Sequence, residues 1–227
     1  EVTHGPIAGW DVSRVDTLAS LFQNKATFNS DVSKWDTSRV TKMGETFAST
    51  RVFNTQLAWD TSKVTNLHTA FHTAEAFNSQ LVWDTSKVTS VWQTFYGAEK
   101  FNKALAWDTS SVTQILHAFN GAEAFNQPLF WDTSKVTTMQ STFARASVFN
   151  QPASISAWDV SKASAMTDMF DDSALASDEC SKQEIFDAWK DVVAFTNEYA
   201  WSAAVCTEPR PPPPPPPLPL EALWSRC

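Results

Sequence analysis

Glycine, cysteine and long apolar runs are scarce in this sequence of 227 residues. Five glycines are few for a loop-rich fold, and no apolar run approaches the roughly 18 residues that a membrane span needs. Basic residues are in deficit, since the formal net charge is −8. This charge argues against nucleic acid or an anionic membrane surface as a partner. None of the ten asparagines starts an Asn-x-Ser/Thr sequon, so ordinary N-glycosylation is not expected.

Catalytic signatures are missing as well. The sequence contains no Ser–His–Asp order, glycine-rich phosphate loop or Cys-x-x-Cys, and its four histidines occupy unrelated positions. His68 and His72 are four residues apart, a spacing that zinc ligands use on a helix. No glutamate completes an HExxH order and no third ligand recurs nearby, so a solvent-facing pair is the favoured interpretation. We therefore predict no enzyme, no cofactor and no metal site.

Aromatic residues, by contrast, are abundant and repeat with a fixed period. The stretch FNSQLVWDTSKVT, which starts at Phe77, recurs almost unchanged from Phe53 and from Phe125. Tryptophan anchors follow one another at intervals of 25, 24, 24, 24, 24 and 27 residues. A fixed period in the twenties is typical of a solenoid whose units bury their apolar faces against each other. The anchors are Trp10, Trp35, Trp59, Trp83, Trp107, Trp131 and Trp158.

One unit illustrates the coil that this pattern predicts. Leu57 and Trp59 are two residues apart, so both face inward if they lie on a short strand. Residues 60–62 read Asp-Thr-Ser, a helix-start signal. The next apolar residues follow at steps of three, four and three, as on one stripe of a helix: Val64, Leu67, Phe71 and Ala74. The predicted fold class is an α/β repeat solenoid, a stack of about six to seven coils of 24 residues with parallel strands.

Two polar columns accompany the anchors. Stacked coils about 4.8 Å apart would let equivalent asparagines hydrogen-bond from coil to coil as a ladder. Each anchor is followed by an aspartate, which we interpret as a helix cap or an Asx turn. A calcium site is the weaker alternative, because a basic column runs beside these carboxylates. The ladder is Asn54, Asn78, Asn102, Asn126 and Asn150, and the predicted caps are Asp36, Asp60, Asp84, Asp108 and Asp132.

The pattern FNQPLFWDTSKVTTMQSTF, residues 125–143, resembles the BspA-like leucine-rich repeats of surface proteins. These tandem repeats are known from mycoplasma lipoproteins and are common in protists and algae. The resemblance covers residues 7–170, with divergent copies at both ends and a final junction, FNQPASISAW, that is three residues longer. It implies a leucine-rich-repeat-like solenoid and an extracellular or cell-surface location. It implies no reaction.

The C-terminal pieces differ from the repeats. Residues 180–195 read CSKQEIFDAWKDVVAF, and Ser181 with Glu184 forms a capping box, which predicts a helix that closes the stack. Similar repeat proteins often end with a cysteine pair, so the resemblance implies a Cys180–Cys206 disulfide and an oxidising compartment. We expect a repeat domain at 1–170, a helical, disulfide-linked cap at 171–206 and a proline-rich tail at 207–227.

The tail carries PRPPPPPPPLPL at residues 209–220, which predicts polyproline II. One interpretation is a stiff spacer, whose prolines the resemblance to algal surface proteins implies are hydroxylated and glycosylated. The alternative is a docking segment for SH3 or WW domains. The partner of Cys227 is left open. The prolines that matter to either interpretation are Pro211, Pro213, Pro216 and Pro219.

These features favour a non-enzymatic extracellular module used for structure, adhesion or assembly. The alternative is an intracellular scaffold whose tail recruits signalling domains. If Leu57 and Trp59 face inward, the residue between them faces out, and this outward column is apolar in consecutive coils. We predict that it contacts a protein partner or a neighbouring copy, with Gln56 and Gln80 as a polar rim. The column consists of Ala58, Val82, Ala106 and Phe130, with Ala157 after the longer junction.

Overall fold

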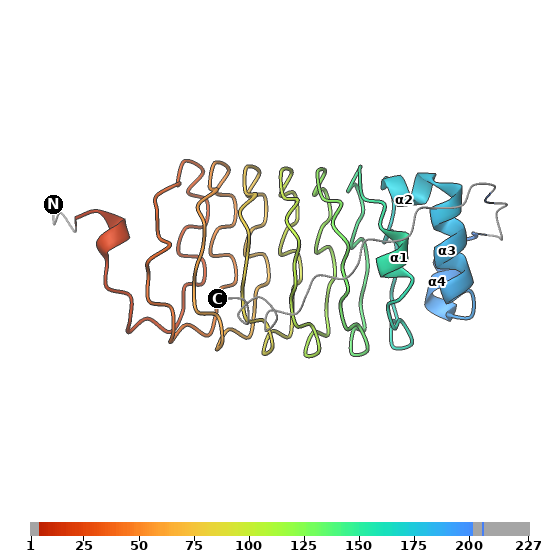
Figure 1. The fold of residues 1–227 in the computed structure, drawn as a ribbon, viewed down its shortest axis with the longest axis horizontal. Helices are drawn as coiled ribbons and strands as arrows, with labels where there is room; N and C mark the ends of the chain where they lie inside the picture. The colour runs from red at the N-terminus through yellow and green to blue at the C-terminus, as the bar shows by residue number, and fades with distance from the viewer. Residues whose placement is uncertain (1–4, 202–205, 207–227) are drawn as a thin grey trace, which may run out of the picture.

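The computed structural model describes residues 5–201 and 206. Figure 1 shows successive coils lying side by side in one row, with the helices gathered at the C-terminal end. A 3₁₀ helix, η1, precedes the row. The elements are η1 (Ile7–Gly9), α1 (Pro152–Ile155), α2 (Ala174–Ser177), α3 (Glu179–Trp189) and α4 (Val193–Glu198).

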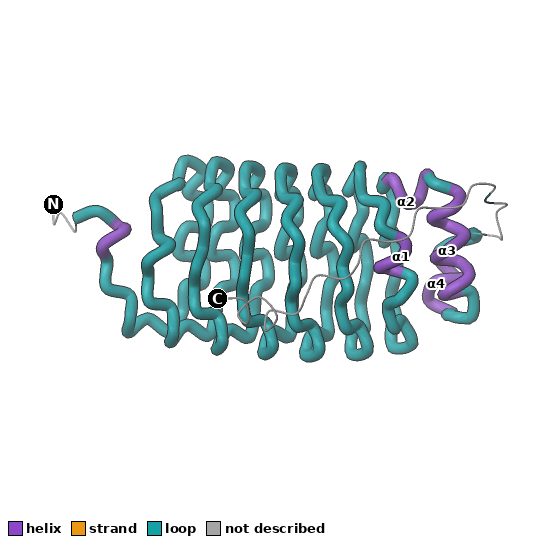
Figure 2. Tube along the Cα trace, in the orientation of Figure 1, coloured by secondary structure: helices purple, strands orange, loops and turns teal. Residues whose placement is uncertain are grey.

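The predicted α/β leucine-rich-repeat-like solenoid is wrong. The coils between η1 and α1 contain neither the predicted strands nor the predicted helices, as Figure 2 shows by the continuous loop colour of this part. Parallel pairing is reduced to isolated bridges of one residue per coil, such as Lys42 with Asn66 and Asn66 with Ser90. These bridges lie seven residues after each tryptophan, so they also miss the Leu57–Trp59 segment where strands were expected.

Backbone amides that would close a helix instead alternate between two kinds of acceptor. Counting along residues 67–74, the odd-numbered amides donate to the next coil, for example Thr69 N–H to the Trp92 carbonyl at 2.8 Å and Phe71 N–H to the Thr94 carbonyl at 2.9 Å. The even-numbered amides close turns within the coil, as Ala74 N–H does to the Phe71 carbonyl at 3.0 Å. A helix would use these donors within its own segment. The three-four spacing of apolar residues therefore comes from a chain of turns.

These turns need a left-handed backbone twice in each coil. Thr69 and Thr73 have φ values of 50° and 49°, and Gln93 and Gly97, their equivalents in the next coil, have 52° and 62°. Most such positions hold residues other than glycine, although a side chain there is strained. A low glycine count therefore does not exclude a loop-rich fold. Because the conformation recurs from coil to coil, the strain belongs to the fold rather than to one site.

The aspartates after the tryptophans close Asx turns, because no helix follows them for a cap to serve. Asp84 Oδ1 accepts the Ser86 amide at 3.0 Å and the Ser86 hydroxyl at 2.7 Å. The intervening Thr85 is buried and donates its hydroxyl to the Asp108 carbonyl of the next coil at 2.9 Å. The same amide bond occurs at Asp36, Asp60, Asp108 and Asp132.

We expect Asp84→Ala to lower the free energy of unfolding by about 0.5–1 kcal/mol, because the turn loses a partly exposed hydrogen-bond acceptor. Asp84→Asn keeps the Oδ1 acceptor and should cost less. Urea unfolding followed by tryptophan fluorescence measures both. Equal losses in the two variants would contradict the Asx-turn role.

The Ser86 hydroxyl and amide hold the pKa of Asp84 below its usual range, and the same holds for Asp60 with Ser62. A carboxylate whose pKa is lowered by folding stabilises the protein above the unfolded pKa of about 4 and loses this contribution as pH falls through the folded value. The unfolding midpoint should therefore fall in acid below about pH 4. Asp84→Asn should reduce that dependence.

The core consists of aromatic columns that run the length of the stack. Phe71 and Phe95 stack with ring centroids 5.6 Å apart, and Trp83 and Trp107 lie 6.5 Å apart with nearly parallel planes. All four side chains are buried. No coil could bury these rings alone, so each depends on its neighbours for its core.

The cap covers the last coil and binds its polar edge. Trp189 of α3 stacks on Phe170 at 6.2 Å, which continues an aromatic column. Asp178, rather than the predicted Ser181, caps α3 by accepting the Ser181 amide at 2.8 Å. Ser181 instead lies inside the helix, and its hydroxyl donates to Asn150 Oδ1, the end of the asparagine column.

Candidate functional site

One strip of surface differs strongly from coil to coil. Positions nine, ten, thirteen and fourteen after each tryptophan carry side chains that change from coil to coil, whereas the neighbouring Asp-Thr-Ser segment is nearly constant. We call this strip the variable face. In three successive coils it carries His68, Thr69, His72 and Thr73, then Trp92, Gln93, Tyr96 and Gly97, then Leu116, His117, Asn120 and Gly121.

A groove follows the variable face along the stack. One cavity of about 380 Å³ is lined by Glu45, His68 and His72, and a second of about 520 Å³ is lined by Tyr96, Arg145 and residues near the cap. Gln93 lines both cavities, so the two adjoin along the variable face, and we call them together the groove. Its lining runs from Gln23 in the first coil to Asp172 in the last.

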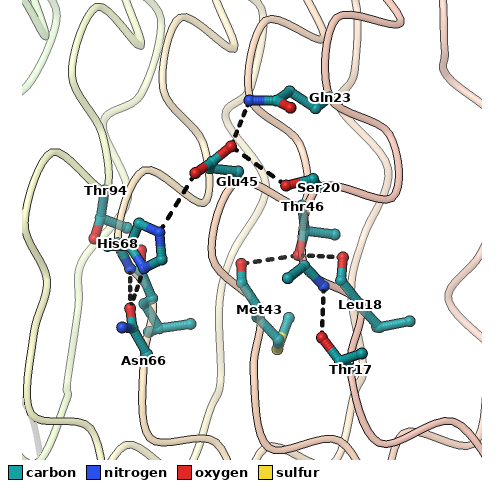
Figure 3. A network of polar contacts seen from close by, with 12 residues as sticks. Thr17, Leu18, Ser20, Gln23, Met43, Glu45, Thr46, Asn66, His68 and Thr94 are labelled. Carbon is teal, nitrogen blue, oxygen red and sulfur yellow. Dashed lines mark hydrogen bonds and ion pairs between the residues drawn. The ribbon is translucent and has the colours of Figure 1, made fainter.

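A polar network orders the N-terminal half of the groove. Figure 3 shows Glu45 between Ser20 and Gln23 on one side and His68 on the other. The Ser20 hydroxyl donates to Glu45 Oε2 at 3.3 Å, and His68 Nε2 lies 3.5 Å from Glu45 Oε1. The imidazole lies over Gly44, where a Cβ atom would come within 2.2 Å of the ring. Only glycine leaves room for His68 in this position.

Paired rings form the middle of the groove. Trp92 stacks with His68 at 6.2 Å and is 39% exposed, and Tyr96 stacks with His72 at 4.8 Å with the planes 5° apart. Burial lowers the pKa of His72, so this imidazole is neutral at neutral pH. The ring planes follow the coil-to-coil stacking, and this part of the groove is therefore rich in aromatic surface.

Arg145 is held rigidly beside these rings. Its guanidinium donates to Asn120 Oδ1 at 2.7 and 3.2 Å and to the Tyr96 hydroxyl at 3.0 Å, and it lies 5.9 Å from the Tyr96 ring centroid. Asn120 is itself buried. Burial, and then the positive charge of Arg145, lower the pKa of nearby His117. The groove therefore has a fixed cation and neutral imidazoles in its central part.

The end of the groove nearest the cap is acidic. Asp168, Asp171 and Asp172 line it, and the Asp168 amide donates to Glu198 of α4 at 3.2 Å. Burial, followed by the charges of these neighbours, raises the pKa of Asp171. Such crowding of carboxylates favours a cation at this end of the groove.

Comparison with known protein families identifies the family of this chain. Residues 1–106 and 81–183 each match the family described as "Mycoplasma protein of unknown function, DUF285". The chain belongs to this family. No curated protein matches the sequence. The two overlapping matches agree with tandem repeats in this DUF285 chain, and together they cover most of its length.

The structure places the predicted apolar column on the surface. Val82 is 61% exposed and Phe130 42% exposed, and Ala58 and Ala106 are also exposed, whereas Leu57 and Trp59 on either side of Ala58 are buried. The predicted rim residues bridge coils: Gln56 Nε2 donates to the Gln80 carbonyl at 3.0 Å and Gln80 Nε2 to the Ala104 carbonyl at 2.7 Å. Contact with a partner stays a prediction.

The asparagine column forms hydrogen bonds from coil to coil, and in each of them a side-chain oxygen accepts a backbone N–H. Asn78 N–H donates to Asn54 Oδ1 at 2.8 Å, and Asn102 N–H donates to Asn78 Oδ1 at 3.0 Å. Asn126 and Asn150 continue this pattern. Each side chain thus satisfies the backbone of the following coil where the chain turns.

Cys180 and Cys206 form a disulfide. The tail prolines Pro211, Pro213, Pro216 and Pro219, and also Cys227, lie outside the described residues. None of the helices in the described ranges is long and apolar enough to cross a membrane. No group of three or more His, Cys, Asp or Glu side chains in these ranges could hold a metal ion.

Sequence reasoning missed the groove. His68, His72 and His117 occupy three different positions in the repeat, and for that reason they look unrelated in the sequence. Folding brings all three into one groove, because the chain of turns exposes every one of these positions on the same side. Aligning the repeats and asking which positions vary would have found this strip.

Proposed function

We propose that this DUF285 chain is a non-enzymatic module, secreted or displayed at a cell surface, that assembles with a second copy of itself. The observation that carries this proposal is the exposed apolar column between buried leucines and tryptophans. Four coil spacings separate Ala58 from Ala157, and the tryptophans beside this column lie 6.2–6.5 Å apart from coil to coil. Aligned apolar surface of this kind marks an interaction site more often than scattered residues do.

The spacing of the column suits a second copy. Val82, Ala106 and Phe130 are separated by 24 residues each, so they lie one coil apart. A two-fold axis at Ala106 would place Val82 of one protomer against Phe130 of its partner, and the reverse contact would form by symmetry. The two large side chains would then flank a small one on both sides. Such self-complementarity is what an isologous interface requires.

The remaining chemistry supports a structural role and an oxidising compartment. The recurring Asp, Thr and Asn side chains of the coils are used in turns and coil-to-coil hydrogen bonds, as Thr61, Asp84 and Asn78 illustrate. The Cys180–Cys206 disulfide supports secretion or surface display, since such bonds persist outside reducing compartments. This proposal needs no contact between the proline-rich tail and the apolar column, so it holds whether the tail serves as a spacer or as a ligand.

We expect Val82→Lys combined with Phe130→Lys to abolish assembly and leave the unfolding curve nearly unchanged, because both side chains are exposed. Two lysines in each protomer would meet across the interface and repel. Sedimentation velocity over a concentration series measures the association.

A matched control replaces two other exposed valines, Val52 and Val148, each 47% exposed, with lysine. This control adds the same charge outside the column and should assemble like the wild type. If the column variant associates as the wild type does, or if it unfolds, the column is not the interface.

A further inference from the structure

We propose that the groove of the variable face binds a proline-rich segment in the polyproline II conformation, and that residues 209–220 of this chain are such a ligand. This site is separate from the apolar column, which lies about half a coil away in the sequence. The proposal therefore does not depend on self-assembly through that column.

The groove extends along the stack, as an extended ligand requires. Its lining extends from Gln23 to Asp172 and so crosses every coil of the stack. Polyproline II repeats every three residues and rises about 3.1 Å per residue, which makes about 9.3 Å per turn. Equivalent rings of neighbouring coils lie 4.8 Å apart at His72 and Tyr96 and 6.2 Å apart at His68 and Trp92. An extended ligand that lies along the groove would therefore contact side chains of several successive coils.

The chemistry of the groove suits such a ligand. A run of prolines offers carbonyl acceptors and apolar rings but no N–H donors. The groove provides donors in Arg145 and Gln93 and aromatic surface in Trp92 and Tyr96. Aromatic-lined grooves are the general means by which proteins bind preformed polyproline II. Arg145 is already fixed by Asn120 and Tyr96, so little side-chain entropy would be lost on binding.

The position and charge of the tail also fit. Cys206 is tied to α3 by the disulfide, and α4 contacts the acidic end of the groove through Glu198. Arg210 follows four residues after Cys206, directly before seven prolines. An arginine there complements Asp168, Asp171 and Asp172. Seven residues of polyproline II span about 22 Å. Four coil spacings separate Asp171 from His72, and the phenylalanines beside this part of the groove lie 5.5–6.0 Å apart from coil to coil, so the two lengths are similar.

The histidines provide a direct test in the full chain, since the protein has only four. The ring-proton NMR signals of His68, His72 and His117 would be compared between the wild type and a variant in which Pro211–Pro217 are replaced by Gly and Ser. We expect these three signals to shift, whereas the His4 signal should not. Adding the peptide PRPPPPPPPLPL to the replaced variant should restore the wild-type positions.

Groove variants distinguish binding from a general effect of the tail. Trp92→Ala in the replaced variant should weaken peptide binding at least about tenfold, which corresponds to about 1.4 kcal/mol, and Trp92→Phe should recover part of it. Phe130→Ala, a matched exposed aromatic in the apolar column, should bind like its parent. Circular dichroism and the unfolding midpoint verify that each variant is folded.

Each outcome decides the proposal. Shifts that are independent of protein concentration show binding within one chain, and shifts that grow with concentration show binding between copies; both support the groove as a proline-binding site. The proposal fails if the replaced variant has wild-type histidine signals and does not respond to millimolar peptide. It also fails if Trp92→Ala binds the peptide as tightly as its parent, or if a linear oligosaccharide such as cellohexaose shifts the signals and the peptide does not.

Discussion

Trp83→Ala is expected to lower the free energy of unfolding by about 3–5 kcal/mol, the range for truncating a buried aromatic residue. Trp83 is 2% exposed, lies 6.5 Å from Trp107 and 5.9 Å from Phe71, and donates its indole N–H to the Leu57 carbonyl at 3.3 Å. Alanine would leave a cavity in the middle of the stack and an unpaired carbonyl. Because each coil relies on its neighbours, the loss should affect both adjacent coils.

Urea unfolding monitored by the fluorescence of the other tryptophans measures this effect. Val82→Ala is the matched control at the adjacent position, where the side chain is 61% exposed, and it should change stability by less than about 0.5 kcal/mol. Trp83→Phe should lower the free energy of unfolding by an intermediate amount, since it keeps an aromatic ring and loses the hydrogen bond. Similar losses for Trp83→Ala and Val82→Ala would refute the inward and outward assignment.

Replacing Cys180 and Cys206 together by serine is expected to cost about 3 kcal/mol. The disulfide joins residues 26 apart, and the loop-closure model assigns about this much to a loop of that size. The enclosed segment includes most of α3 and all of α4. Trp189 packs over the last coil at Phe170, and Phe195 packs edge-on against Trp189. Without the cross-link, the cap should open before the coils do.

Hydrogen exchange measured by mass spectrometry locates this effect. We expect faster exchange in residues 175–199 of the double variant, with central coils such as residues 83–107 nearly unaffected. Reduced wild-type protein should behave like the double variant. Uniform acceleration along the whole stack, or no acceleration in the cap, would show that the disulfide does not act through the cap.

Sequence patterns within one coil predicted the buried side chains correctly but not the backbone conformation. Alternation of Leu57, Ala58 and Trp59 indicates which side chains are buried, because adjacent residues in an extended segment point to opposite sides. The same patterns failed for Val64, Leu67, Phe71 and Ala74, since steps of three and four fit both a helix and a chain of four-residue turns. The deciding hydrogen bonds run to another coil and are not visible in one repeat.

The groove shows a second kind of limit. Gly44 matters because the His68 ring lies on it, and Arg145 matters because Tyr96, 49 residues away, accepts its hydrogen bond. These contacts join different coils, so their partners depend on the winding of the chain. No motif within a single repeat predicts them.

The sequence by itself determined the period, the anchoring tryptophans, the buried phenylalanines and the polar residues that link one coil to the next. These follow from a repeat that must bury the same face against its own copy. Only the tertiary structure decided between turns and helices, because alternate backbone amides donate to their own coil and to the next coil. It also decided that His68 meets Trp92 and that Arg145 meets Tyr96, because stacking aligns positions that the linear sequence keeps 24 or more residues apart.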